Sequence, residues 1–303
     1  MSDIASVYAE ISPLVLPLWE SVKSVANSSF TTSLAGAFAG AIAAQRIVEK
    51  GKFREELVKE FHHTNAAISL ATAAACVALA LKKQHIKALK NSYDEDQKSV
   101  ETHKEKIHTG QIAADTPLEL RPNLLYLQEI SPPITTIQEM VLTRLSTVGR
   151  AISAVTALAG AVANLNGALV KRNLLLDVFK NKQFPEGASF EHMYLGLPYG
   201  ERHTNQEYGG SVEAVSLYTD DVIFFSMKLC EDLRDHGEIL KKRYKSRLKG
   251  KPPRISTVNF EIARQDGLLP KDEDYEKWLS GFISAPENKS KWWQRISPRS
   301  WLN

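Results

Sequence analysis

The stretch ITTIQEMVLTRLSTVGRAISAVTALAGAVANLNGALVKRNLLLDVF, residues Ile134–Phe179, decides the fold class of this chain. Its large apolar residues recur mostly at steps of three or four: Ile134, Ile137, Val141, Leu145, Val148, Ile152, Val155, Leu158, Val162, Leu165, Leu169, Leu176 and Phe179. This is the period of a helix with one buried face. Such a helix would be about 70 Å long, so elements of similar length must cover its apolar face. The stretch therefore predicts a bundle of long antiparallel helices with coiled-coil-like packing.

The composition is that of an ordinary folded protein, with 43% hydrophobic and 24% charged residues in a chain of 303. A formal net charge of +3 is too small to indicate nucleic-acid binding, which needs a concentrated basic face. Cys76 and Cys230 are the only cysteines, so the sequence predicts neither a disulfide framework nor a thiolate zinc site. Few segments alternate apolar and polar residues as strands do, which favours an all-α fold.

Residues 24–45 carry no charge, and the run is long enough to span a bilayer core of about 30 Å. Many of its residues are small or polar, so it is a marginal transmembrane helix. Its large apolar side chains lie four residues apart on one ridge: Phe30, Leu34, Phe38 and Ile42. Gly36 and Gly40 form a GxxxG pair on roughly the opposite face, which lets another helix backbone approach closely. Two interpretations stay open: a spanning helix that self-associates, and an Ala-rich helix packed in a soluble bundle.

Basic residues follow this run more densely than they precede it. Arg46, Lys50, Lys52 and Arg54 come after it, whereas Lys23 stands alone before it. The basic flank of a membrane helix faces the cytoplasm. If the run spans a membrane, the rest of the chain is therefore cytoplasmic.

A second uncharged run, residues 64–81, is predicted to lie in a packed helix. Lysines follow it as well, so both of its flanks are basic and the orientation rule gives no consistent answer. Its apolar face also continues into charged sequence, as it does in a helix that packs on a partner. We therefore predict one helix over residues 64–108, antiparallel to the helix of residues 134–179.

A third uncharged run, residues 151–170, lies inside the long predicted helix. It contains Asn164 and Asn166, and the apolar face passes through it unchanged, which argues against membrane insertion. Asn166 and Asn173 fall on or near that face. A polar residue there often fixes the register of paired helices, and we favour this role over ligand binding.

The helical period stops after Lys182, and residues 183–210 are rich in glycine, proline and aromatic residues. A loop of this length is either functional or disordered, and the aromatic residues argue against disorder. The candidate binding residues are Glu191, His192, Tyr194, Arg202, His203 and Tyr208. The alternative, which we favour, is that the loop only covers the end of the helices, because nothing fixes a nucleophile beside a base.

The last residues combine tryptophan with basic side chains: Lys289, Lys291, Trp292, Trp293, Arg295, Arg299 and Trp301. Tryptophan is favoured at the headgroup level of a membrane, and basic residues are attracted to anionic lipid. This tail is predicted to touch a membrane surface. The competing interpretation is that Trp292 and Trp293 dock on the protein's own core.

No catalytic motif is present in the sequence. There is no P-loop, no GxGxxG after a strand and no GxSxG elbow, and the histidines lack the spacing of metal ligands. The sequence therefore predicts no catalytic residues, no cofactor and no metal site, and it names no ligand.

Four stretches, AGAIAAQRI, HTNAAISLA, LKKQHIKAL and HMYLGLPYG, resemble a family of uncharacterised bacterial helical proteins that have an Ala/Gly-rich N-terminal segment. The resemblance extends along much of the chain and implies a bacterial origin. No activity is attached to that family, so the resemblance implies nothing about mechanism.

These features predict three regions: an anchor and juxtamembrane helix over residues 1–63, a long-helix bundle over 64–250, and a C-terminal extension over 251–303. The first functional hypothesis is a protein of the bacterial inner membrane that has a cytoplasmic C-terminal part and acts as a self-associating scaffold. The second is a soluble, cytoplasmic helical adaptor. The third is an enzyme that uses the loop of residues 183–210.

Overall fold

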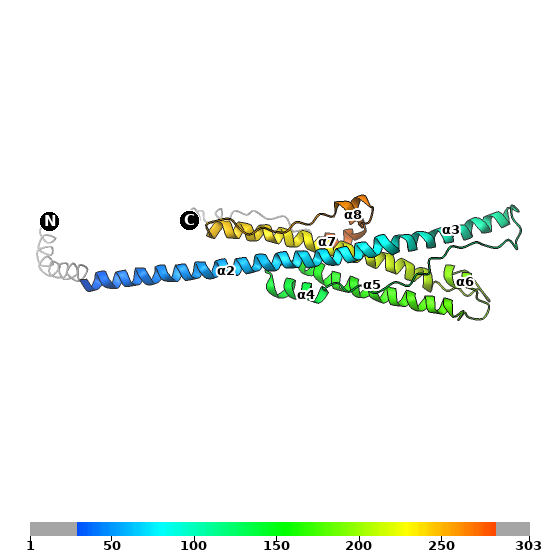
Figure 1. Ribbon diagram of the computed structural model, residues 1–303, viewed down its shortest axis with the longest axis horizontal. Coiled ribbons are helices and arrows are strands. Elements are labelled where there is room, and N and C mark those ends of the chain that lie inside the picture. Colours follow the sequence, from blue (N-terminus) through cyan, green and yellow to red (C-terminus); the bar gives the residue numbers. More distant parts are fainter. Residues whose placement is uncertain (1–28, 283–303) are drawn as a thin grey trace, which may run out of the picture. The chain divides into compact units, whose positions relative to one another are not determined.

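The computed structural model describes residues 29–282, with side chains described from residue 36 onward. All regular elements in this part of the chain are helical, which confirms the predicted all-α class (Figure 1). The helices are α2 (Ser29–Leu81), α3 (Lys87–His108), α4 (Ile134–Glu139), α5 (Arg150–Lys180), α6 (Phe190–Leu195), α7 (Glu207–Arg247), α8 (Glu261–Gln265) and α9 (Glu276–Ser280). Two π-helical turns, η1 (Lys82–Ile86) and η2 (Met140–Arg144), and one 3₁₀ turn, η3 (Asp272–Tyr275), complete the set.

The chain divides into two compact units. The larger unit contains Glu60–Lys241 and the residues from Pro253 on, and the smaller contains the residues up to Lys59 together with Lys242–Pro252. Helices α2 and α7 each contribute residues to both units. In the smaller unit, the guanidinium carbon of Arg247 lies 5.0 Å from the ring centre of Phe53.

Helices α2 and α3 follow one another through the π-turn η1, and α2 has no break at residues 63–64. The prediction of a helix over residues 64–108 is confirmed, although the helix begins much earlier than residue 64. In the larger unit, α2 buries one stripe of small and apolar side chains: Ala67, Ile68, Ala71, Ala74, Ala75 and Ala78. The spacing of this stripe is that of one helix face.

The single helix predicted over residues 134–179 is wrong, because its first part breaks away. The π-turn η2 ends at Arg144, Leu145 is extended, and α5 begins only at Arg150. Gly149 has a φ of +68°, a conformation that favours glycine. Ser146 uses its backbone N–H and its hydroxyl to bind Glu60, and such contacts compete with helix formation.

The relative direction predicted for two of the long helices is also wrong. Within the larger unit, Glu60 of α2 lies beside Ser146, which precedes α5, and Tyr93 of α3 and Phe179 of α5 both contact Tyr208. Helices α2–α3 and α5 therefore run parallel, and α7 runs antiparallel to both (Figure 1).

The parallel arrangement requires the chain to return between α3 and α5. Residues 118–133 make this return in extended form, and the part from residue 123 to 130, which we call the strap, lies along α5. Two asparagines of α5 hold it: Asn166 pairs with the backbone of Ile130, and Asn173 pairs with the backbone of Leu127. The asparagines therefore bind a backbone, and the role predicted for them in helix register is wrong.

A second extended segment, residues 253–260, belongs to the larger unit and lies against α2 and α7. The Asn65 amide donates to the carbonyl of Arg254 at 2.9 Å and accepts the N–H of Ser256 at 2.9 Å. Between these two residues, Ile255 packs against Gly237, where an added Cβ would lie 2.6 Å from the Ile255 side chain. A larger residue at position 237 would therefore force the Ile255 side chain to shift.

Candidate functional site

The six loop residues proposed from the sequence do not converge on one site. Tyr194 and Tyr208 are buried and lie in an aromatic cluster with Tyr93, Phe179 and Phe190. The Tyr194 hydroxyl donates to Asp96 at 2.8 Å. Burial is the main cause that raises the pKa of Tyr194, and this hydrogen bond raises it further. These two tyrosines therefore form part of the core of the larger unit.

The other four loop residues lie at the surface or near it. Glu191 and His192 both contact Ser189, which caps α6, so their polar groups serve the start of that helix. Arg202 and His203 are exposed, and His203 pairs through its backbone with Tyr199.

Arg172 lies next to the aromatic cluster and is fully buried. Its Nη1 donates to the carbonyl of Leu125 at 2.7 Å, and its Nη2 donates to the carbonyl of Asn123 at 3.0 Å. Its Nε has no hydrogen-bond partner within residues 29–282. The guanidinium thus binds two backbone carbonyls of the strap, which gives it a structural role. No sequence signal indicated this, because a charged residue on a helix is usually exposed.

Glu60 joins three segments of the larger unit. One of its oxygens, Oε1, accepts the Ser146 hydroxyl at 2.6 Å and lies 3.0 Å from Nε2 of His236 on α7. Burial opposes ionisation of Glu60, but the hydrogen bonds from His236 and Ser146 outweigh it and lower the pKa of Glu60 to about 2. The serine contacts the carboxylate and not the imidazole, so this group is an electrostatic link between elements and not a nucleophile–base pair.

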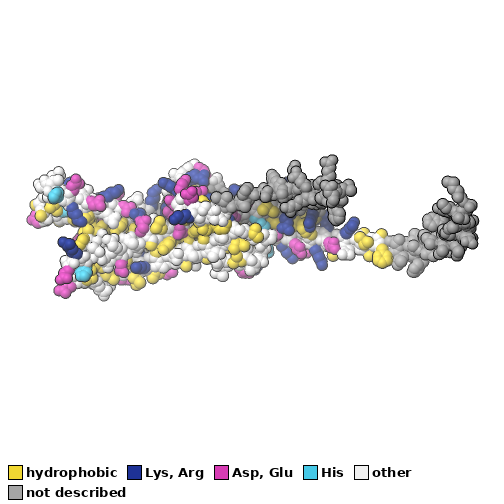
Figure 2. Space-filling view, turned by 180° about the vertical axis from the view of Figure 1, so that it is seen from behind, with side chains coloured by type: hydrophobic (Ala, Val, Ile, Leu, Met, Phe, Trp, Pro, Cys, Tyr) yellow, Lys and Arg dark blue, Asp and Glu magenta, His cyan; other side chains and the backbone are white. Residues whose placement is uncertain are grey.

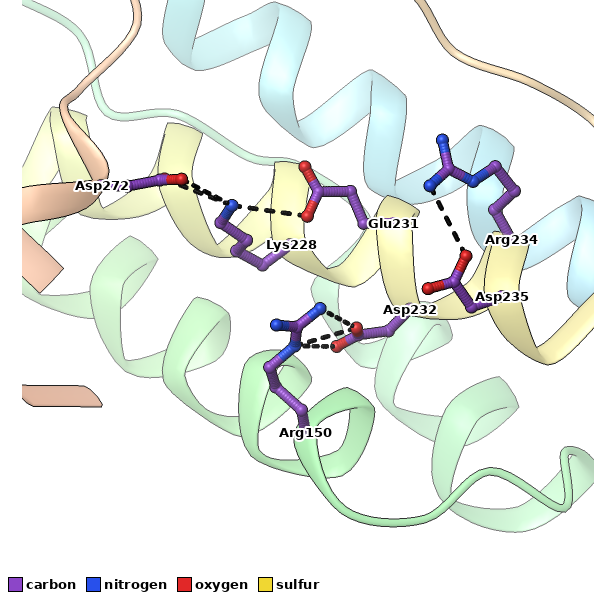
Figure 3. Close-up of polar contacts among 7 residues, drawn as sticks. All are labelled: Arg150, Lys228, Glu231, Asp232, Arg234, Asp235 and Asp272. Carbon is purple, nitrogen blue, oxygen red and sulfur yellow. Dashed lines mark hydrogen bonds and ion pairs between the residues drawn. The ribbon is translucent and has the colours of Figure 1, made fainter. Parts of the chain in front are cut away.

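Charged residues are concentrated along the middle of α7 (Figure 3). Lys228 is buried and lies 3.4 Å from Glu231 and 3.2 Å from Asp272. Arg150 of α5 donates hydrogen bonds to Asp232 through both Nε and Nη2, with Nε 2.9 Å from Oδ1. Figure 3 shows Glu231 and Arg234 on the side of α7 that faces away from the Arg150–Asp232 pair. Among the described residues, the Arg234 guanidinium makes a long contact, 3.5 Å, with the neighbouring Asp235.

A cavity of about 180 Å³ opens on that side of α7. Its walls come from α2, α7, the second extended segment and α8: Ile68, Met227, Cys230, Glu231, Arg234, Ser256, Val258, Asn259, Phe260, Glu261 and Arg264. The Cys230 thiol in its wall is buried, and burial raises the pKa of that thiol to about 11, so it is not a reactive thiolate.

Two adjacent carboxylates of α7, Asp220 and Asp221, pair with residues outside the loop of residues 183–210. Asp220 forms an ion pair with Lys82 of η1, and Asp221 accepts a hydrogen bond from Tyr275 at 2.8 Å. The Tyr275 ring stacks on Phe224 with ring centres 3.7 Å apart, so the α9 region is docked on α7. Within residues 36–282, no three His, Cys, Asp or Glu side chains are grouped as metal ligands would be.

The residues predicted to contact a membrane or a second copy lie partly within the described chain. Phe38 and Ile42 are exposed by 64% and 51%, and Gly36 and Gly40 have no neighbouring atom within 4 Å of an added Cβ. Figure 2 shows hydrophobic side chains grouped at this described end of α2. The side chains of Phe30 and Leu34 are not described, and Trp292, Trp293 and Trp301 lie outside the described residues.

Two described helices, Gly36–His108 and Arg150–Lys180, are long and apolar enough to cross a membrane by length and composition. In each, 39% of the apolar window is buried inside the protein. Core helices of soluble proteins pass the same test, so this is weak evidence for a membrane location.

No protein-family model, no curated protein and no solved structure matches this chain. The function is therefore inferred from its own residues.

Proposed function

We propose that this is a membrane-anchored helical protein that acts by association, with the region of residues 24–45 as its anchor. The observation that carries the proposal is the exposure of Phe38 and Ile42, one turn apart on the same face of α2. Exposed apolar side chains grouped on a surface mark contacts with membranes or partners. In this proposal the larger unit is a scaffold of helices in the cytoplasm of a bacterium, and the anchor lies in the inner membrane.

The charges that follow the anchor support this orientation. Ile47 and Val48 are exposed by 73% and 56%, and they lie beside Arg46 and Lys50 at the point where the uncharged run ends. Apolar and basic side chains side by side suit the boundary between the hydrocarbon core and the cytoplasmic headgroups. Carbonate extraction of a membrane pellet tests the anchor, because peripheral proteins are released by that wash and spanning ones are kept.

Self-association through the glycine face is the second part of the proposal. Apart from the helix's own backbone, nothing in the described chain lies within 4 Å of an added Cβ at Gly40, so the side chain of Gly40→Leu starts in open space within one copy. A loss of cross-linked dimer in this variant would therefore come from a contact with another helix. Gly160→Leu is the matched control, because Gly160 lies on α5 and is equally open. Equal dimer yields in wild type, variant and control would remove the glycine face from the proposal.

The tail from Asn288 on is proposed as a second membrane contact. Truncation at Ala285 is expected to reduce binding to anionic liposomes and to leave the melting temperature unchanged. A lower melting temperature with unchanged liposome binding would show that the tail docks on the protein instead.

One observation favours the alternative of a soluble helical adaptor. The apolar stretch of residues 64–81 buries its stripe inside the larger unit, and Thr72 in it contacts Cys230 of α7 at 3.6 Å. The adaptor hypothesis extends this packing to the whole of α2. It predicts that the full-length protein remains in the soluble fraction of a cell lysate.

A further inference from the structure

The cavity beside α7 has a charge pattern that the proposed anchor does not use. Four of its wall residues are charged, two acidic and two basic: Glu231 and Arg234 from α7, and Glu261 and Arg264 from α8. Each helix contributes one glutamate and, three residues later, one arginine, a spacing that puts both side chains on one face. The sequences EDLR at residues 231–234 and EIAR at 261–264 thus present the same pair of charges to one space.

The two charged residues that α7 contributes to this cavity make only long contacts among the described residues. Arg234 has the 3.5 Å contact with Asp235, and Glu231 has the 3.4 Å contact with Lys228, both longer than a good charge-assisted hydrogen bond. Arg264 and Glu261 pair with each other at 3.1 Å. Because both charges on α7 lack a short partner, a ligand that carries complementary groups would improve their hydrogen bonding.

Apolar side chains complete the walls. Ile68 of α2, Met227 of α7, and Val258 and Phe260 of the second extended segment line the same space. Figure 3 shows the side chains of Glu231 and Arg234 extending from α7. Both residues line the cavity together with these apolar residues. A ligand with a charged part and an apolar part would therefore find both kinds of contact here.

The size of the cavity limits the ligand. A volume of about 180 Å³ holds roughly six water molecules at about 30 Å³ each. Pockets for drug-sized ligands begin at about 300 Å³, so only a smaller molecule fits here. The two glutamates and two arginines of the wall have a net charge of zero. A ligand with one carboxylate and one ammonium group also has no net charge, and it offers each wall charge a group of opposite sign.

We propose that this cavity binds a free α-amino acid with an apolar side chain. Its carboxylate accepts hydrogen bonds from the arginines, its ammonium group donates to the glutamates, and its side chain lies against Ile68, Met227, Val258 and Phe260. The proposal is independent of the membrane anchor, because every wall residue belongs to the larger unit.

Calorimetric titration of the full-length protein with each of the standard amino acids at millimolar concentration tests the proposal. At least one apolar amino acid is expected to bind, and leucine is the reference. Isoamylamine lacks its carboxylate and 4-methylpentanoate lacks its ammonium group, so each is expected to bind about tenfold or more weakly. Arg234→Gln and Glu231→Gln are expected to weaken amino-acid binding by a similar factor of about ten.

Arg243→Gln is the matched control, because Arg243 is an exposed arginine of α7 and lies outside the cavity. It is expected to bind as the wild type does. The side chains of Arg234 and Glu231 are 50% and 40% exposed, so circular dichroism melts of these variants are expected to match the wild type. If no standard amino acid binds, or if the analogues or the cavity variants bind as tightly as leucine binds the wild type, the proposal is overturned.

Discussion

The side-chain amide of Asn166 pairs with both backbone groups of Ile130: the Ile130 N–H donates to Oδ1 at 2.9 Å, and Nδ2 donates to the Ile130 carbonyl at 2.9 Å. Asn173 holds Leu127 in the same way, at 3.2 and 2.7 Å. From Asn166 to Asn173 the helix rises about 10.5 Å, and from Ile130 to Leu127 an extended chain covers about 10 Å. Because these distances match, α5 satisfies the strap backbone as a neighbouring strand would.

Asn166→Ala is expected to destabilise the protein by about 2–4 kcal/mol, because it leaves a buried N–H and a buried carbonyl of Ile130 without partners. Urea unfolding followed by circular dichroism measures the change. Asn164→Ala is the matched control, since Asn164 is exposed on the same helix, and its effect is expected to stay within about 0.5 kcal/mol. Equal stabilities of the two variants would contradict the role assigned to Asn166.

Gly237→Ala is expected to destabilise the protein by about 1–3 kcal/mol, because the new methyl group would overlap the Ile255 side chain at 2.6 Å. Gly167→Ala has no such neighbour and is expected to stabilise α5 by up to about 1 kcal/mol. Thermal melts compare the two. Adding Ile255→Ala to Gly237→Ala removes the overlapping atoms. The double variant is therefore expected to be as stable as the Ile255→Ala single variant. A Gly237→Ala variant as stable as wild type would rule out the close packing.

The lowered pKa of Glu60 predicts a loss of stability in acid. The pKa of Glu60 is about 2 in the folded protein and 4.5 for an unperturbed glutamate, so its contribution to stability is present above pH 4.5 and is lost as the pH falls toward 2. At 1.36 kcal/mol per pKa unit the contribution is about 3 kcal/mol at most, and solvent screening at the partly exposed side chain reduces it.

Glu60→Gln removes this titration. The melting temperature of the variant is expected to fall less than that of the wild type between neutral pH and pH of about 3. Glu55→Gln serves as the control, because Glu55 is exposed and pairs only with Lys59 one turn away. Parallel pH profiles for wild type and Glu60→Gln would show that the link to His236 and Ser146 does not stabilise the fold.

The sequence predicts the helical class and the continuous helix over residues 64–108 correctly, because both follow from local apolar spacing. It fails where distant segments decide the local structure. Leu145 and Val148 fit the helical period, yet Ser146 binds Glu60 of a different helix and Gly149 has a positive φ, so the helix starts at Arg150.

Prediction of the candidate site from the sequence fails for the same reason. The roles of Asn166 and Asn173 depend on where the strap lies, and no pattern within α5 reveals that the strap runs beside it. Tyr194 and Tyr208 look like binding residues because they lie in a loop-rich stretch, but they pack into the core. The cavity beside α7 combines residues far apart in the chain, and only the repeated EDLR and EIAR spacing marks it in the sequence.

The most direct test of the proposed membrane anchor is carbonate extraction of membranes from cells that express three forms of the full-length chain. These are the wild type, Phe38→Glu with Ile42→Glu, and a control that carries Leu217→Glu with Ile239→Glu on α7. All four replaced residues are exposed by more than half, so each variant is expected to keep its fold, as circular dichroism will verify. The wild type and the control are expected to remain in the washed pellet, and the Phe38/Ile42 variant to appear in the soluble fraction. A wild type that leaves the pellet, or a Phe38/Ile42 variant that remains there, would contradict the anchor.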